Sequence, residues 1–177
     1  MVLTMLSSCA VVPNMQTVSY VDLDRFMGDW HVIASVPTLL DRHAIDPIEH
    51  YARNSDGTIQ TTYSYRKKPS NSTLPRDSST NKSSASIAPR TEKTAKGYVL
   101  DHQSNAVWGM QFVWPIKADY RVVYLDEDYE YTIIARNKKD YAWVMSRNPN
   151  ISKQKRQELL DFVASLGYQI EDFSIHH

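Results

Sequence analysis

Short segments rich in Tyr, Val, Ile and Thr recur along the chain from Trp30 onward. Turn sequences such as Asn54-Ser55-Asp56-Gly57 separate them. Many short strands with turns between them are typical of antiparallel barrels and sandwiches. Eight strands can close into a barrel that has no free edge and an interior wide enough for one small ligand. The predicted strands are Asp29–Val36, Glu49–Arg53, Thr58–Arg66, Thr91–Val99, Ala106–Trp114, Tyr120–Leu125, Tyr131–Ala135 and Tyr141–Arg147.

The hydrophobic pattern changes after the eighth predicted strand. Apolar residues then recur at helical spacing between Ser152, which suits an N-cap, and Gly167, which suits a C-cap. We expect a helix over about 152–166 on the outer wall of the barrel, and a short extra strand within Tyr168–Ile175. The predicted fold class is all-β, an eight-stranded up-and-down antiparallel β-barrel with one C-terminal α-helix packed outside.

The length and charge of the chain narrow the class of protein. A chain of 177 residues fits one domain with a sizeable core, and we place that barrel domain at residues 20–177. The chain has 20 basic and 20 acidic residues, so its formal net charge is zero. Without a basic surplus, we expect no nucleic-acid partner.

The single cysteine, Cys9, lies near the N-terminus, which excludes an internal disulfide and a Cys-rich metal site. Leu6-Ser7-Ser8-Cys9 resembles the bacterial lipobox, whose cysteine is acylated and becomes the mature N-terminus. Residues 1–19 are then a signal remnant, a lipobox and a tether to the membrane. However, no Lys or Arg precedes Cys9, and the stretch before it is short for a signal peptide. Either the true start lies upstream, or the match is chance and Cys9 is a reactive or buried thiol.

The segment from Lys67 to Arg90 is dominated by Ser, Asn, Thr and Pro and holds few large apolar residues. This composition predicts a mobile loop. The alternative is a lid or a partner-binding loop at one end of the barrel.

The first predicted strand opens with Gly28-Asp29-Trp30, directly after the turn-like segment Asp22–Met27. Glycine permits a sharp entry from a turn into a strand. The indole of Trp30 is large enough to plug one end of a barrel. By itself this Gly-x-Trp pattern is weak, because short patterns often occur by chance.

Two later segments complete an ordered set of motifs. Leu125–Tyr131 stands between the sixth and seventh strands, and Trp143-Val144-Met145-Ser146-Arg147 ends the eighth. Together with Gly28-Asp29-Trp30, this order resembles the lipocalin family, although the Thr of the family's Thr-Asp-Tyr turn is absent. The similarity is greatest to the bacterial outer-membrane lipoprotein lipocalins, which share the patterns at Val32-Ile33-Ala34, at Tyr141 to Trp143 and at Ser146-Arg147-Asn148-Pro149.

The resemblance implies a structural pair, a ligand and a location. In the family, an Arg at the position of Arg147 lies across the Trp of the first strand, here Trp30, so we expect these side chains to touch. Members of the outer-membrane group are lipid-anchored and are thought to bind fatty acids or lysophospholipids. The implied protein binds, stores or transports such a ligand in the cell envelope, facing the periplasm from the outer membrane. A homodimer is implied by resemblance only.

The parity of each strand predicts a lining for the cup, because successive strand residues face opposite sides of the sheet. The large apolar residues of the fifth strand share one parity, Arg121 is expected to face outward, and Arg147 fixes the inward face of the eighth strand. The predicted ligand-binding residues are Trp108, Met110, Phe112, Tyr120, Val122, Tyr124, Tyr141, Trp143 and Met145. The alternative is that these residues are plain core.

We expect no catalytic residue, metal site or cofactor. A few lipocalins are enzymes, and one kind uses a cysteine inside the barrel, whereas Cys9 precedes the barrel. The histidines lack metal-ligand spacing. Asp41 with His43, or Glu49 with His50, fits solvated polar residues better than an acid–base pair. The competing class is a structural or interaction protein whose barrel is filled by its own side chains.

Overall fold

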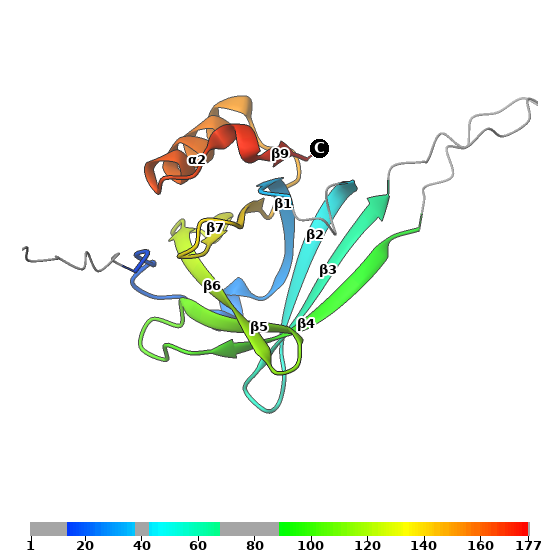
Figure 1. Ribbon diagram of the computed structural model, residues 1–177, viewed down its shortest axis with the longest axis vertical. Coiled ribbons are helices and arrows are strands. Elements are labelled where there is room, and N and C mark those ends of the chain that lie inside the picture. Colours follow the sequence, from blue (N-terminus) through cyan, green and yellow to red (C-terminus); the bar gives the residue numbers. More distant parts are fainter. Residues whose placement is uncertain (1–13, 38–42, 68–88, 177) are drawn as a thin grey trace, which may run out of the picture.

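The computed structural model describes residues 14–37, 43–67 and 89–176, which form one closed sheet with a helix against its outer wall (Figure 1). Cys9 and nearly all of the Ser- and Asn-rich segment lie outside these residues, so the predicted anchor and loop are not described.

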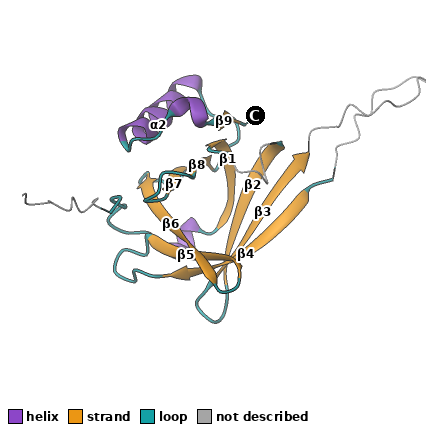
Figure 2. Ribbon diagram, in the orientation of Figure 1, coloured by secondary structure: helices purple, strands orange, loops and turns teal. Residues whose placement is uncertain are grey.

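Eight antiparallel strands close into a barrel in up-and-down order (Figure 2). Each strand pairs with the next one along the chain, and β8 and β2 both pair with β1, which closes the sheet. The fold class predicted from the sequence is confirmed. The strands are β1 (Gly28–Ser35), β2 (Ala44–Arg53), β3 (Ile59–Lys67), β4 (Thr91–Val99), β5 (Val107–Val113), β6 (Ile116–Leu125), β7 (Tyr131–Ala135) and β8 (Ala142–Ser146).

Strand β2 begins before the predicted start at Glu49 because a bulge accommodates Pro47 inside it. The register against β3 shifts between Ile45 and Ile48, and Asp46 has a φ of 51°. A bulge releases the backbone from regular pairing, so a proline that lacks a donor N–H is tolerated there. Because β2 starts earlier than predicted, its alternating buried residues include Pro47 as well as Glu49 and Tyr51.

The helix α2 (Lys153–Ser165) follows the barrel as predicted. The Ser152 hydroxyl accepts a hydrogen bond from the backbone N–H of Lys155, and Gly167 takes a φ of +88° just beyond the helix. Leu159, Leu160 and Val163 are buried against the outer face of β6, β7 and β8. Each such side chain contributes about 1.5 to 3 kcal/mol when fully buried, so the helix is held mainly by this stripe.

The chain then returns to the sheet, as the sequence predicted. A short 3-10 turn, η1 (Ile170–Asp172), leads into β9 (Ser174–Ile175). Strand β9 pairs with Ala34 and Ser35 of β1, whereas β2 pairs with β1 only over Gly28 to His31. The last strand therefore covers the part of the β1 edge that β2 leaves unpaired.

One end of the barrel is closed by the helix α1 (Leu23–Phe26) and by the first-strand tryptophan. The guanidinium carbon of Arg147 lies 3.8 Å from the centre of the Trp30 ring, which confirms the predicted contact. The Trp30 indole N–H donates to the carbonyl oxygen of Phe26. Residues 14–18, which we expected to belong to a tether, lie against the barrel, since the Val18 N–H donates to the Val122 carbonyl.

Candidate ligand-binding cavity

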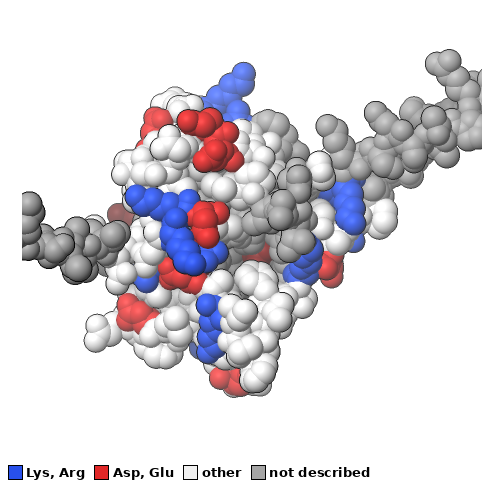
Figure 3. All heavy atoms as spheres, in the orientation of Figure 1, with Lys and Arg blue, Asp and Glu red and all other residues white. Residues whose placement is uncertain are grey.

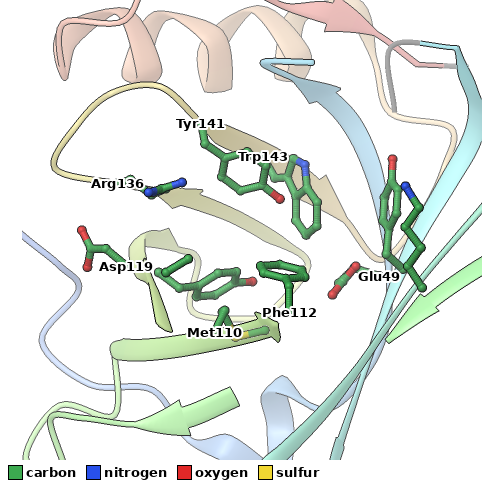
Figure 4. Close-up of a pocket in the computed structure, with 11 residues that line it drawn as sticks. Glu49, Met110, Phe112, Asp119, Arg136, Tyr141 and Trp143 are labelled. Carbon is green, nitrogen blue, oxygen red and sulfur yellow. The ribbon is translucent and has the colours of Figure 1, made fainter. Parts of the chain in front are cut away.

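A cavity of about 270 Å³ lies inside the barrel at the end opposite α1 (Figure 4). Apolar and aromatic side chains make up most of its wall, with a few charged residues between them. It is lined by Glu49, Tyr63, Lys93, Met110, Phe112, Ala118, Asp119, Tyr120, Arg136, Tyr141 and Trp143. A largely apolar recess with a few convergent polar groups is typical of a small-molecule site.

Aromatic side chains fill the half of the barrel below this cavity. The ring of Phe26 contacts those of Trp30, Tyr51 and Trp108, and Tyr51 also contacts Trp108, with ring centres 5.2 to 5.7 Å apart. The ring of Tyr120 stacks on Trp108 at 5.3 Å and an interplanar angle of 11°. Tyr120 is therefore the floor of the cavity and also the top of the aromatic core.

Five of the nine predicted lining residues face the cavity: Met110, Phe112, Tyr120, Tyr141 and Trp143. Three others, Trp108, Val122 and Met145, point inward but are buried in the core below it. They have the predicted orientation without touching the cavity. Strand parity identifies which face of a residue's strand is inner, but not how deep the residue lies along the barrel axis.

The prediction that Tyr124 faces the interior is wrong. The register between β6 and β7 shifts, so that Val122 pairs with Ile134 and Tyr124 with Ile133, leaving Val123 as an extra residue. A bulge of this kind reverses the parity of every residue after it. The ring of Tyr124 lies outside the barrel, 5.2 Å from the ring of Phe162 on α2.

An aromatic wall forms the side of the cavity. Tyr63 and Trp143 are stacked with ring centres 5.3 Å apart and an interplanar angle of 16°. Tyr141 meets Trp143 at 5.0 Å in a tilted contact. Such contacts fix the ring orientations and leave flat apolar surfaces toward the cavity.

The cavity contains one deeply buried acid, Glu49, which comes from the inner face of β2. Its exposed fraction is 3%, and its Oε2 atom has no hydrogen-bond partner. Burial raises the pKa of the Glu49 carboxyl well above its usual value, although a hydrogen bond with Thr61 acts in the opposite direction. The expectation that Glu49 is a solvated polar residue is wrong.

Glu49 and Tyr63, two of the lining residues that the prediction missed, have signals in the sequence. Glu49 shares strand parity with Tyr51, a core residue, and this alternation places it inside. Tyr63 alternates in the same way with Tyr65 on β3. Ala118 and Asp119 precede the predicted start of the sixth strand, so the parity of that strand does not cover them. Nothing in the sequence singles out Lys93 or Arg136.

Two tyrosines below Glu49 form a polar contact in the buried interior. The hydroxyl groups of Tyr51 and Tyr120 are hydrogen-bonded to each other. Burial raises the pKa of both hydroxyls well above their usual value, and the nearby Glu49 carboxyl adds to this effect. Both tyrosines therefore stay neutral and form the polar part of the cavity floor.

Charged side chains stand across the cavity from Glu49, at the start of β6 and the end of β7 (Figure 4). The Arg136 Nε atom lies 3.5 Å from an Asp140 carboxylate oxygen, and Asp119 accepts hydrogen bonds from Arg121 and from the backbone N–H of Asn137. Together with Lys93, these residues place both positive and negative charges on the cavity wall.

The hairpin between β5 and β6 carries a group of exposed apolar residues next to the cavity. Phe112 lines the cavity and yet is 62% exposed, and Trp114 at the turn is 82% exposed. Val113 and Ile116 are exposed beside them. A contiguous exposed apolar patch is unusual on a soluble protein and is typical of a binding region.

Basic and acidic side chains lie next to one another on the face seen in Figure 3, in keeping with the balanced charge of the sequence.

Within the described ranges, no group of three or more His, Cys, Asp and Glu residues is placed to hold a metal ion. No helix in the same ranges is long and apolar enough to cross a membrane. His50 is paired with Asp29 at the surface, at 2.6 Å, rather than with Glu49.

The profile of the Lipocalin-like domain family matches residues 21–177 of this chain. The chain belongs to the lipocalin family. Temperature-induced lipocalin-1 of Arabidopsis thaliana is 26% identical over 164 residues, which cover 89% of this chain and 79% of that protein. Outer membrane lipoprotein Blc of Citrobacter freundii is 25% identical over 150 residues, covering 84% of this chain and 75% of that protein.

Solved structures agree on the fold of this lipocalin. Insecticyanin of the tobacco hornworm Manduca sexta superposes with a TM-score of 0.62 over 93% of this chain and 85% of that one, at 15% identity. An identity this low supports the shared barrel and nothing finer. As a family, lipocalins bind or transport small hydrophobic ligands, and a binding role for this lipocalin is consistent with its cavity.

Proposed function

We propose that this lipocalin binds and carries an amphiphilic lipid, a fatty acid or a lysophospholipid, in the cell envelope. The observation that carries the proposal is the cavity of about 270 Å³ between Tyr63, Trp143 and Phe112, which is walled mostly by aromatic and apolar side chains. An acyl chain gains free energy when it leaves water for such a surface, at about 25 cal/mol per Å² buried. The function is binding without catalysis.

The charged residues of the cavity wall suit the polar end of such a ligand. Arg136 and Lys93 supply cationic groups that attract a carboxylate or a phosphate. The exposed apolar residues Phe112 and Trp114 beside the cavity give an acyl chain a continuous apolar path from the surface inward. The ligand would therefore lie with its chain among the aromatic rings and its head group near the charged residues.

The competing function, a barrel filled by its own side chains, finds less support. Aromatic side chains fill the half of the interior around Trp30 and Trp108, but the half above Tyr120 holds the cavity. A purely structural barrel has no need to leave this volume unfilled, since each missing contact lowers its stability.

The proposed location rests on Cys9 and on one relative. The lipobox-like sequence Leu6-Ser7-Ser8-Cys9 suits an acylated N-terminus, and the relative from Citrobacter freundii is named an outer membrane lipoprotein. An acyl anchor on Cys9 would hold the barrel at the outer membrane, facing the periplasm. A homodimer is part of the proposal by family resemblance alone, and light scattering on the purified protein tests it.

Extraction of the purified protein, followed by mass spectrometry, tests the ligand. We expect a fatty acid or lysophospholipid at close to one mole per mole of barrel, and saturable uptake of a fluorescent fatty acid. Displacement of the fluorescent probe by unlabelled fatty acid is the control for specific binding. An extract without lipid, together with no uptake of the probe, would contradict the proposed function.

Metabolic labelling with an alkynyl palmitate tests the anchor separately. In a bacterial host that expresses the full chain, we expect label on the wild-type protein and none on the Cys9→Ser variant. Wild-type protein that reaches the cell envelope and stays unlabelled would refute the anchor while leaving the ligand proposal standing.

A further inference from the structure

Glu49 is a buried acid for which the proposed ligand classes supply no obvious partner. A fatty acid or lysophospholipid that enters chain first would bring only methylene and methyl groups toward it. The Glu49 Oε2 atom has no hydrogen-bond partner, and no basic side chain of the described ranges is ion-paired with it. Buried polar groups in native proteins are nearly always hydrogen-bonded, so an unpartnered oxygen facing a cavity calls for a functional explanation.

The surroundings of Glu49 hold its carboxyl at the cavity. Its neighbours across the sheet are Trp30 on β1 and Tyr63 on β3, and Thr61 bonds the carboxyl itself. Figure 4 shows the carboxyl group beside the cavity, on the side away from Arg136 and Asp119. The Oε2 atom is thus buried beside the cavity without a partner, where a donor group of a ligand would satisfy it.

We propose that Glu49 is a specificity-determining residue that selects ligands with a hydrogen-bond donor, a hydroxyl or a protonated amine, in the part that lies inside the barrel. The inference rests on the proposed function, because it concerns the same cavity. It sharpens the ligand class from an amphiphile with a plain acyl chain to one whose buried portion carries a donor group.

The aromatic wall supports the same chemistry. Tyr63, Tyr120 and Trp143 present rings near the acid, and aromatic faces attract cations as well as apolar chains. An ammonium group would gain both an ion pair with Glu49 and contact with these rings. A hydroxyl group would donate to Oε2 without any change of charge.

A plain chain has the opposite effect. Its methyl end supplies no donor, so Oε2 stays unsatisfied, whereas a hydroxyl or ammonium group gives Oε2 its missing hydrogen bond, a difference of about tenfold in affinity. Selection by Glu49 thus acts by favouring ligands that supply the missing donor.

The test compares dodecanoic, ω-hydroxydodecanoic and ω-aminododecanoic acids, which share one chain and one carboxylate and differ only at the far end. Their dissociation constants are measured by displacement of a fluorescent fatty acid from the full chain. We expect the hydroxy and amino acids to bind about tenfold more tightly than dodecanoic acid. Equal affinities, or tighter binding of the plain acid, would overturn the proposal.

Two variants assign any preference to Glu49. Glu49→Leu should lose the preference for both donors and bind dodecanoic acid more tightly than the wild type. Glu49→Gln should keep the preference for the hydroxyl, because its amide oxygen still accepts, but lose the preference for the ammonium group. A preference that persists in Glu49→Leu would place the discrimination elsewhere and refute the assignment.

Glu92→Gln is the matched control, since Glu92 is an exposed acid on β4 whose removal changes the net charge equally. It should bind all three acids as the wild type does. Failure of the two proposals is distinguishable. If none of the acids displaces the probe, the proposed function fails, whereas displacement by all three with equal strength refutes only the role of Glu49.

Discussion

The guanidinium of Arg147 lies over the indole of Trp30, with its central carbon 3.8 Å from the ring centre. Its nitrogen atoms also donate to the backbone carbonyls of Arg25, Phe26, Met27 and Asp29. This one side chain therefore ties the end of β8 to α1 and to the start of β1, and completes the closed end of the barrel.

Arg147→Ala should lower the free energy of unfolding by about 2 to 4 kcal/mol, because it removes the stacked cation and leaves several carbonyls without their donor. Urea denaturation measures the change. Arg53→Ala is the control, since its ion pair with Asp24 is exposed and such pairs contribute at most about 1 kcal/mol. Similar losses of unfolding free energy in the two variants would show that the contacts of Arg147 are not a principal stabiliser of the fold.

Truncation of Tyr124 should lower the stability of the fold, whereas truncation of Phe112 should lower the affinity for the ligand. Tyr124→Ala removes a contact with Phe162 on the outer wall, so it should cost about 1 to 3 kcal/mol of stability and leave the affinity for a fluorescent fatty acid unchanged. Phe112→Ala removes a half-exposed lining residue, so it should weaken binding with little effect on stability. A loss of affinity on Tyr124→Ala alone would contradict the outward orientation.

Ala118 offers a way to fill the cavity, because it is the smallest lining side chain. We expect Ala118→Phe to weaken fatty-acid binding by at least about tenfold while the overpacking costs about 1 to 3 kcal/mol at most. Equilibrium titration with the fluorescent probe measures the first effect, and circular dichroism during thermal unfolding the second. Full affinity in a folded Ala118→Phe variant would place the ligand somewhere else.

The buried acid predicts a pH dependence of stability. In the unfolded chain the Glu49 carboxyl loses its proton near pH 4.3, whereas its raised pKa in the fold delays this loss to higher pH. Between these two pH values the folded state holds the extra proton. The free energy of unfolding therefore falls as pH rises through this window, by up to about 1.4 kcal/mol per pH unit, and is unaffected below it.

Glu49→Gln should remove this dependence. Its stability relative to the wild type should be constant below about pH 4 and should increase as the pH rises above the pKa of an unfolded glutamate. Urea denaturation at several pH values from acid to neutral gives the comparison, with Glu92→Gln as the variant of equal charge at an exposed site. A difference that stays flat across this range would mean that Glu49 is solvated in the folded protein.

The sequence determined most of the fold. Alternation of apolar residues and turn sequences located all eight barrel strands, two of them, Thr91–Val99 and Tyr131–Ala135, with the bounds that the structure has. Helical spacing between Ser152 and Gly167 located α2. These signals are local, since a strand or helix buries one face and its own residues record which face that is.

The composition of the cavity depended on the tertiary structure. The bulge at Val123 turned Tyr124 outward, and the depth along the barrel axis separated Trp108, which is core, from Met110, which is lining. Both properties depend on the pairing between strands, which no single strand encodes. For Glu49, too, the strand alone gave the inward orientation and the tertiary structure decided the burial. Its parity was readable from Tyr51, but the burial that leaves its oxygen unpartnered arises only when the closed sheet excludes water around it.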